Sequence, residues 1–394
     1  MKLRDRWLLP EGIGELLPAE AWALETVRRQ LLDCYRSWGY ELVIPPFIEY
    51  LDSLLTGTGH DLDLQTFKLT DQLTGRTLGV RADMTPQVAR IDAHRLQREE
   101  PVRLCYLGTV LHTRADGFAG SRSPMQVGAE LFGNASVASD LEVLALMLET
   151  LRLTGVQDIH LDLGHVGIFR GLAAEAGLDA DREAILFDAL QRKAIPELRD
   201  LTADLPAEQG ARLCRLATLN GGHEVLAEAR AQLAGASAAT REALDNLCAI
   251  ADAARENLPD TPLHFDLAEL RGYTFHTGVV FAAFVPGQGQ EIARGGRYDH
   301  IGEVFGRARP ATGFSTDLKT LLALGRRTES PGPRGIFAPA GGDTALRKRM
   351  VALRGAGERV VQCLPEQVGD ARAMGCTREL RRQDGQWLVV DLEE

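Results

Sequence analysis

The chain has 394 residues and a formal net charge of −11; 45% of its residues are hydrophobic and 25% are charged. This is the composition of a globular protein with enough chain for about two domains of ~150 residues. No apolar stretch approaches the ~18 residues of a membrane span and no signal-peptide pattern opens the chain, so we expect a cytoplasmic protein without a membrane partner. The acidic charge also argues against a nucleic-acid partner, because the longest basic run is three residues, at 347–349.

Six cysteines are scattered along the sequence with no CxxC pair. This spacing is not typical of a zinc site or of a disulfide framework, so buried reduced thiols are expected. We expect neither a metal ion nor another cofactor.

The first half of the chain predicts helices and strands in alternation. An amphipathic helix follows Pro18 and ends at Gly39, because its apolar residues recur every three or four positions. A second helix is expected to open at Ser139, with Glu142 three residues later as a capping box, and to run to about Leu153. Strands are expected at 40–48, 64–70, 76–82 and 158–164.

The amino-acid composition changes at about 168–258, where Ala, Leu, Arg and Glu dominate. Helical periodicity holds through this segment, which predicts an all-helical insertion. Strands return at 263–270 and 281–285. SPGPRG (330–335) is a predicted linker between a core at 1–325 and a small α/β unit at 335–394. Strands, a helical block and strands again indicate an α+β fold, with helices packed on an antiparallel sheet.

Two early segments carry polar residues that could contact a ligand. GYELVIPPFIE (39–49) is consistent with an ordinary Pro-bounded edge strand. In VRADMTPQVAR (80–90), Asp83 and Thr85 share one face if the segment is extended, and that pair suits a cationic amino group. A solvated turn with an Asp–Arg pair explains the same residues.

The segment 105–133 predicts two strands around a loop, and its second strand alternates. Gln126, Gly128 and Glu130 fall on one face, and apolar residues fall on the other. Polar side chains on an inward face favour ligand contacts over core filling. The segments 270–281, 293–306 and 311–324 then add glycines beside aromatic and charged residues, each of which alone is consistent with a turn-rich hairpin.

Taken in order, these segments resemble histidyl-tRNA synthetase over residues 1 to about 325, with RGYTFHTG (271–278) and GGRYD (295–299) as the most specific strings. The resemblance implies a class II aminoacyl-tRNA synthetase-like antiparallel sheet flanked by helices, with a helical insertion. It also implies a set of histidine-binding positions, in which an aspartate replaces the family's glutamate and Phe and His replace paired tyrosines. These positions are Asp83, Thr85, His112, Gln126, Glu130, Arg271, Phe275 and His276.

The departures from the synthetase pattern concern ATP. LHTRA (111–115) stands where active members have a sequence like FRxER, so His112 replaces a phosphate-binding arginine. GFSTDLKTL (313–321) stands for GxGLERL, and Thr320 replaces a second one. Because adenylyl transfer depends on cationic stabilisation of phosphate charge, we expect no catalytic residues and no amino-acid activation.

DMTPQVARI (83–91) and LRGYTFHTG (270–278) are more similar to the regulatory subunits of ATP phosphoribosyltransferase, which are synthetase paralogues, than to active synthetases. That resemblance implies a non-catalytic subunit that activates the short-form catalytic subunit in the first step of histidine biosynthesis. Heteromeric assembly, self-association and L-histidine as an effector are implied with it. Whether histidine binds in the former synthetase pocket or at a subunit interface stays open, and an active histidine–tRNA ligase and a sensor of uncharged tRNA are the alternatives.

Overall fold

The computed structural model describes residues 7–57, 60–115, 121–325 and 335–392. The chain divides into two compact units, Met1–Arg326 and Arg327–Glu394. The predicted linker lies outside the described residues, apart from Gly335.

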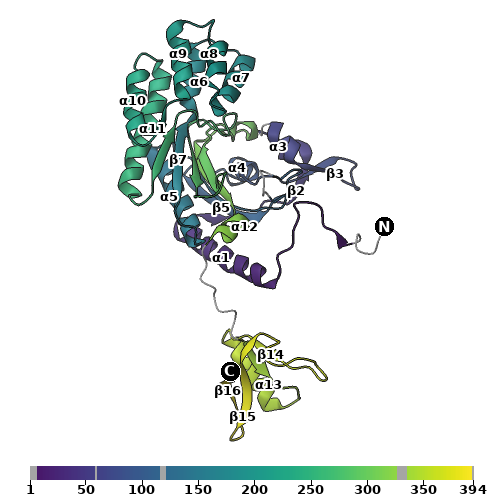
Figure 1. Cartoon of the computed structure of the whole chain (residues 1–394). Helices are drawn as coiled ribbons and strands as arrows, with labels where there is room; N and C mark the ends of the chain where they lie inside the picture. Colours follow the sequence, from purple (N-terminus) through teal and green to yellow (C-terminus); the bar gives the residue numbers. More distant parts are fainter. Residues whose placement is uncertain (1–6, 58–59, 116–120, 326–334, 393–394) are drawn as a thin grey trace. The chain divides into compact units, whose positions relative to one another are not determined.

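The larger unit is built on a nine-stranded sheet whose strands run in the order β1-β5-β6-β12-β11-β10-β7-β9-β8 (Figure 1). The pairs β1–β5 and β7–β9 are parallel, and all other neighbours in this sheet are antiparallel. The strands are β1 (Glu41–Leu42), β5 (Val102–Thr109), β6 (Met125–Phe132), β7 (His160–His165), β8 (Asn220–Gly221), β9 (Leu263–Asp266), β10 (Val279–Phe284), β11 (Ala293–Arg297) and β12 (Ala311–Asp317).

Helices α1 (Pro18–Ser37) and α5 (Val137–Leu153) cover one face of this sheet. The apolar residues of β6 and β12 on that face, Val127 and Phe314 among them, join Tyr35 and Leu144 in one large core. The rings of Tyr35 and Phe314 meet edge to face at 6.4 Å. Because side chains alternate along a strand, this packing turns the even-numbered residues of β6 to the opposite face. Helix α12 (Leu318–Leu324) follows β12 and packs with the same core.

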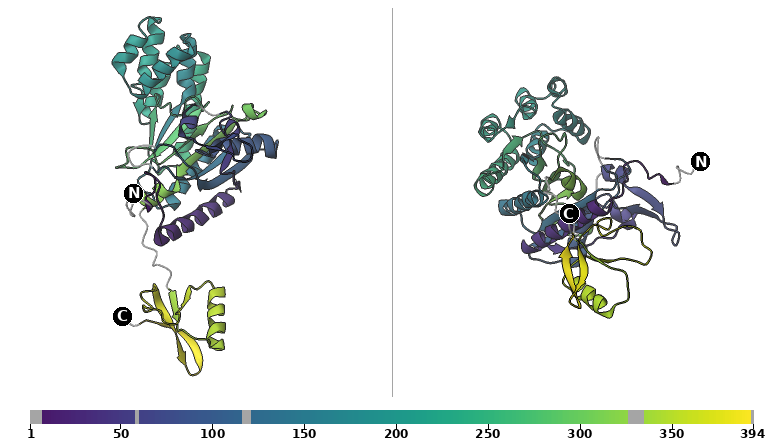
Figure 2. Two further views of the ribbon diagram at one scale, coloured as in Figure 1. Left: turned by 90° about the vertical axis from the view of Figure 1, so that its right-hand side faces the viewer. Right: turned by 60° about the horizontal axis from the view of Figure 1, so that its bottom comes forward.

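The predicted helical insertion connects β7 to β9. A parallel pair cannot be closed by a hairpin, so the chain needs a long crossover, and here the crossover is the helical block itself (Figure 2). One two-residue strand, β8, interrupts it and pairs with β9, so the expectation of an all-helical segment is wrong at that point. The helices are α6 (Val166–Glu175), α7 (Ala180–Gln191), α8 (Ile195–Leu201), α9 (Ala207–Leu216), α10 (Glu224–Gln232) and α11 (Ala238–Asn257).

The strand predicted at 40–48 is not continuous. Pro45 and Pro46 lack the N–H that a ladder requires, and the chain leaves the main sheet there. It resumes as β2 in a separate sheet of order β2-β4-β3, and the predicted strand at 64–70 begins later because a helix precedes it. The elements of this region are β2 (Ile48–Tyr50), α2 (Leu51–Leu54), α3 (His60–Gln65), β3 (Phe67–Thr70), β4 (Thr77–Val80), α4 (Thr85–Arg90) and the π-helix η2 (Ile91–Leu96).

The capping box expected at Ser139 is also wrong. Helix α5 begins at Val137 with Ser136 as its N-cap residue, so Ser139 already lies inside the helix. The Glu142 carboxylate does not reach back to a cap. It accepts hydrogen bonds from the Arg103 guanidinium on β5 at 2.7 and 2.8 Å. A partner from a distant strand therefore takes the place of the expected cap.

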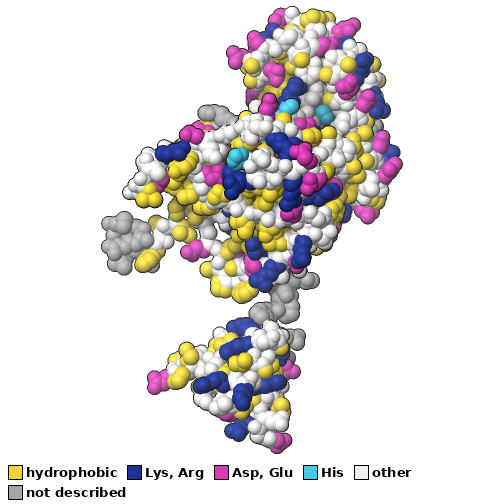
Figure 3. Space-filling view, turned by 180° about the vertical axis from the view of Figure 1, so that it is seen from behind, with side chains coloured by type: hydrophobic (Ala, Val, Ile, Leu, Met, Phe, Trp, Pro, Cys, Tyr) yellow, Lys and Arg dark blue, Asp and Glu magenta, His cyan; other side chains and the backbone are white. Residues whose placement is uncertain are grey.

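The smaller unit has a four-stranded sheet of order β14-β13-β15-β16 with one helix, and Ile336, Leu346, Met350 and Leu380 lie in its core. Strand β15 does not show the apolar pattern of a buried strand, because most of its sequence, TRELRRQ, is polar. Figure 3 shows Lys and Arg side chains gathered on one face of this unit. Residues 335–394 nevertheless hold nine basic and nine acidic residues, so they contribute nothing to the net charge of −11. The elements are β13 (Gly335–Ala338), α13 (Thr344–Gly355), β14 (Val360–Gln362), β15 (Cys376–Gln383) and β16 (Gln386–Asp391).

All six cysteines lie in the described residues and are free. Within the described part of the chain, no helix is long and apolar enough to cross a membrane. No group of His, Cys, Asp and Glu among these residues is placed to hold a metal ion.

Candidate functional site

The face of the main sheet opposite α1 and α5 carries the predicted polar residues. Glu130 on β6 pairs with Gly313 on β12, which pairs with Gly296 on β11, so all three positions share that face. A Cβ atom on Gly313 would lie 1.4 Å from the Glu130 Oε2, and one on Gly296 would lie 2.9 Å from the His276 ring. The two glycines therefore leave room on the sheet for the carboxylate and the imidazole.

Glu130 is held by two tyrosines and is 1% exposed. The hydroxyl of Tyr106 donates to its Oε1 at 2.9 Å, and the hydroxyl of Tyr298 donates to its Oε2. Burial raises the pKa of Glu130 to about 8, although both tyrosine hydrogen bonds act in the opposite direction. Glu130 is thus a buried carboxyl group that can carry a proton near neutral pH.

Asp83, Thr85 and Gln126 form one continuous network with this carboxyl group. The Asp83 Oδ1 accepts hydrogen bonds from the Gln126 amide at 2.7 Å and from the Thr85 backbone at 2.9 Å. The Thr85 hydroxyl lies 3.1 Å from the hydroxyl of Tyr106, which leads on to Glu130. Thr85 begins helix α4 rather than continuing an extended segment, so the turn before the helix brings Asp83 and Thr85 together.

Phe275 and His276 lie at the other side of the Glu130 cluster. The Phe275 ring stacks on Tyr298, with the ring centroids 4.9 Å apart. The His276 Nδ1 lies 3.3 Å from the carbonyl oxygen of Arg297. Burial lowers the pKa of His276 to about 4, so its imidazole is neutral.

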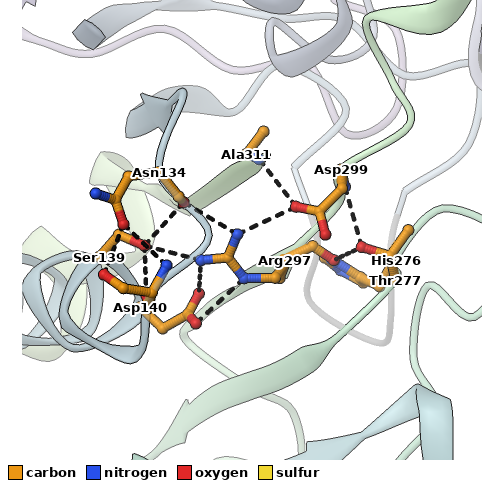
Figure 4. Close-up of polar contacts among 9 residues, drawn as sticks. Asn134, Ser139, Asp140, His276, Thr277, Arg297, Asp299 and Ala311 are labelled. Carbon is orange, nitrogen blue, oxygen red and sulfur yellow. Dashed lines mark hydrogen bonds and ion pairs between the residues drawn. The ribbon is translucent and has the colours of Figure 1, made fainter. Parts of the chain in front are cut away.

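Arg297 anchors this side of the site to helix α5 (Figure 4). Its guanidinium lies 2.9 Å from the Asp140 carboxylate and donates to the Ser139 hydroxyl at 2.8 Å. It also donates to Asp299 at 3.1 Å, and the Arg297 carbonyl accepts from the Thr277 backbone at 2.7 Å. The strand that supports His276 is therefore fixed by a buried ion pair.

Arg271 has different partners from the rest of the predicted set. Its guanidinium lies 2.9 Å from Glu291 and 3.5 Å from Glu269, and it packs over the Phe284 ring. Phe284 ends β10, three strands away from β6. At ~4.8 Å per strand, Phe284 is about 14 Å from the Gln126 position on β6. Within the described residues, Arg271 has no hydrogen bond or ion pair with another predicted site residue.

The two positions expected to have lost an arginine are engaged locally. The His112 Nε2 lies 2.9 Å from the carbonyl oxygen of Ala82, just after β5. The Thr320 hydroxyl donates to Asp317 at 2.7 Å, and Asp317 also caps α12 by accepting from the Lys319 backbone at 3.1 Å.

Sequence reasoning did not select Tyr106, Tyr298 or Arg297. Arg297 and Tyr298 were visible in the GGRYD string. Only the fold shows that the hydroxyls of Tyr106 and Tyr298 both bond to Glu130.

The fold and this site define a class II synthetase-like protein. Residues 12–321 match the family model for histidyl-tRNA synthetase, and residues 333–390 match the model for the C-terminal domain of the ATP phosphoribosyltransferase subunit HisZ. The ATP phosphoribosyltransferase regulatory subunit of Thioalkalivibrio sulfidiphilus is 66% identical, covering 98% of this chain and 99% of that protein. The protein of the same name from Pseudomonas putida F1 is 59% identical, covering 99% of each. The chain belongs to the family of ATP phosphoribosyltransferase regulatory subunits.

Solved structures agree with this assignment. A Bacillus halodurans protein described as an ATP phosphoribosyltransferase regulatory subunit/histidyl-tRNA synthetase superposes with a TM-score of 0.81 at 27% identity, covering 94% of this chain and 96% of that one. Histidyl-tRNA synthetase from Nostoc superposes with a TM-score of 0.78 at 18% identity, covering 98% and 97%, which shows the shared fold alone. The class II synthetase-like fold predicted from the sequence is confirmed.

Proposed function

We propose that this chain is a non-catalytic subunit that activates the short-form catalytic subunit of ATP phosphoribosyltransferase in histidine biosynthesis and passes histidine feedback to it. The observation that carries the proposal is a buried polar network suited to an amino acid, in a protein whose relatives are named regulatory subunits. A ligand that is bound but not converted can act only through the state it stabilises.

The absence of amino-acid activation is part of this proposal. Activation needs cations around the ATP phosphates, and one missing contact of this kind typically costs ~3 kcal/mol or more in the barrier. His112 and Thr320 occupy the two positions that resemble phosphate-binding arginines in the synthetases, and each is held by neighbouring protein atoms. The Asp317 carboxylate accepts the hydrogen bond of Thr320, and its negative charge would repel a phosphate bound there.

The proposed ligand is L-histidine, bound in the former synthetase pocket. Asp83 is only partly buried and its two hydrogen bonds both use Oδ1, which leaves the other oxygen for the ligand's ammonium group. Glu130 and its two tyrosines offer a buried site for an imidazole, which both donates and accepts. The other positions assigned by resemblance stay predictions, and Arg271, which lies against two glutamates, is the one that we do not place against the ligand.

We also infer that the subunit self-associates in the cytoplasm. Apolar side chains on the passage from β1 to β2 are strongly exposed, with Ile44 at 80%, Phe47 at 43% and Ile48 at 46%. Exposed apolar residues that lie this close along the chain are typical of association surfaces.

The test is to co-purify the chain with the short-form transferase of the same organism and to assay the mixture with and without L-histidine. We expect transferase activity to depend on this chain and to fall when histidine is added. A matched chain with Glu130→Ala should still activate the transferase and should lose the response to histidine. A transferase that is equally active without this chain would refute the proposal.

A further inference from the structure

Arg81 is a buried cation with no carboxylate partner. Three arginines are buried in the described part of the chain, namely Arg81, Arg297 and Arg309, each 7–8% exposed. Arg297 is paired with Asp140 at 2.9 Å, and Arg309 is paired with Asp92 at 3.1 Å. Arg81 instead donates to two backbone carbonyls, from Nη1 to Pro45 at 2.7 Å and from Nε to Thr109 at 3.0 Å.

The difference matters because a buried charge is stable only when an opposite charge or several hydrogen bonds compensate it. Burial is the one influence that acts on the pKa of Arg81, and it lowers it. The two carbonyls fix the guanidinium in place and the Phe47 ring lies 5.4 Å from its Cζ, but no carboxylate among the described residues neutralises the charge. The Nη2 atom takes part in neither bond.

The Arg81 Nη2, which takes part in neither hydrogen bond, lies on the face of the main sheet that carries Glu130. Gly108 on β5 pairs with Gln126 on β6, so both positions are on the face that carries Tyr106 and Glu130. A Cβ atom on Gly108 would lie 2.5 Å from the Arg81 Nη2. The guanidinium therefore rests directly above this glycine, on the strand next to Gln126. Gly108 is only half-buried, so the core does not seal this position.

The one arginine among the predicted site residues is too far away to take this role. Arg271 lies on the far side of β6, three strands away, and two glutamates neutralise it. Arg81 stands two residues before Asp83, whose Oδ1 holds the Gln126 amide. Gln126 in turn pairs with Gly108, over which the Arg81 Nη2 lies. A cation and an anion that flank the same strand position match the carboxylate and the ammonium of an α-amino acid.

We propose that Arg81 is the residue that binds the α-carboxylate of the amino-acid ligand. The Nη2 donates to the carboxylate, Asp83 accepts from the ammonium, and Gly108 is required because a side chain there would displace the guanidinium. This assignment rests on the proposed function, since it deepens the same ligand pocket.

The test uses isothermal titration calorimetry of the full chain with L-histidine and with L-histidinol, which replaces the carboxylate by a hydroxymethyl group. Wild type should prefer histidine by about tenfold to a hundredfold, the range for a hydrogen bond to a charged group. Arg81→Met should bind the two ligands with nearly equal affinity, and Arg81→Lys should retain part of the preference because it keeps the charge.

A second variant leaves the arginine itself in place. Gly108→Ala should reduce the preference as Arg81→Met does, because the new methyl group meets the Nη2. Gly289→Ala is the matched control, because a Cβ at Gly289 meets no atom within 4 Å. Circular dichroism of each variant reports whether the chain is folded.

The outcomes separate the two claims. If wild type binds neither ligand, the pocket of the proposed function is refuted and this assignment falls with it. If wild type prefers histidine and both Arg81→Met and Gly108→Ala keep that preference, the assignment to Arg81 is wrong while the pocket stands. Loss of the preference in Arg271→Gln alone would place the carboxylate at Arg271 instead.

Discussion

The charged groups around Glu130 and around Arg271, at two ends of the predicted ligand-binding residues, have opposite surroundings. Around Glu130, tyrosine hydroxyls and the network to Asp83 and Gln126 enclose polar groups within the protein. Around Arg271, the cation is 41% exposed and lies against two glutamates near the end of β10. The first arrangement is an enclosed network of polar groups, whereas the second neutralises a cation on a partly open surface. This contrast is why the proposed amino-acid site is placed at the Glu130 network and not at Arg271.

The largest expected effect is the absence of adenylation. We expect no histidine-dependent exchange of pyrophosphate into ATP by the purified chain, because we propose that His112 and Thr320 replace phosphate-binding arginines of the synthetases. An active histidyl-tRNA synthetase assayed in parallel is the positive control. Measurable exchange that disappears in Arg271→Ala would contradict the prediction.

Arg297→Met should be the most destabilising single change at the Glu130 end. It leaves the buried Asp140 carboxylate without its partner, which typically costs about 3–5 kcal/mol of unfolding free energy. Arg294→Met is the matched control, because Arg294 is 62% exposed and its contact with Glu291 is long, at 3.4 Å. Urea unfolding of both variants measures the difference, and similar losses would show that Arg297 is not a buried anchor.

Coupling between the pocket and the transferase should be the next effect in size. Binding coupling is reciprocal, so substrates of the transferase should weaken histidine binding to the assembled complex by the same factor by which histidine weakens theirs. The usual range is about 5–150-fold. Titrating histidine with and without phosphoribosyl pyrophosphate measures it, and an unchanged affinity would defeat the feedback mechanism.

The buried carboxyl group at Glu130 predicts a specific pH dependence. Its pKa is raised to about 8, whereas that of an unfolded glutamate is ~4.3. Between these values the folded state keeps a proton that the unfolded state has lost, so this contribution to stability is present at low pH and is lost as pH rises towards about 8. The stability advantage of wild type over Glu130→Gln should therefore shrink between about pH 5 and about pH 8.

Urea unfolding at both ends of that pH window measures this change. Glu303→Gln, which removes a carboxylate that is 72% exposed, controls for the general effect of charge. An advantage of wild type that stays constant across this window would show that Glu130 is ionised throughout.

Local patterns in the sequence were enough to predict some of this site. The two-residue alternation of β6 placed Gln126 and Glu130 on one face, and the helical spacing defined α1 nearly to its observed bounds. Such patterns depend on residues close in sequence. The same holds for the small unit, where three of the four strands are apolar enough to recognise.

What the sequence did not reveal depends on contacts between distant segments. Tyr106 and Tyr298 are 24 and 168 residues from Glu130, and an aromatic residue in a strand is ordinarily interpreted as core. The break at Pro45 was visible, but the change of sheet that follows it depends on the pairing of β2 with β4. One partner of Arg271, Glu269, is two residues earlier, but the closer one, Glu291, is twenty residues later, and only the fold shows that contact.

The smallest expected effect is at Arg271, where the two ends of the face can be compared directly. A partly exposed ion pair contributes about 0–1 kcal/mol, because water screens the charges and two long side chains lose freedom. Arg271→Ala should therefore lower the unfolding free energy by less than about 1 kcal/mol, well below Arg297→Met. Its histidine affinity should also change little, since the Glu130 network and Arg81 are untouched. Calorimetry and urea unfolding of this one variant measure both quantities. A large loss of histidine affinity with little loss of stability would move Arg271 into the pocket and would mean that its contact with Glu291 breaks when the ligand binds.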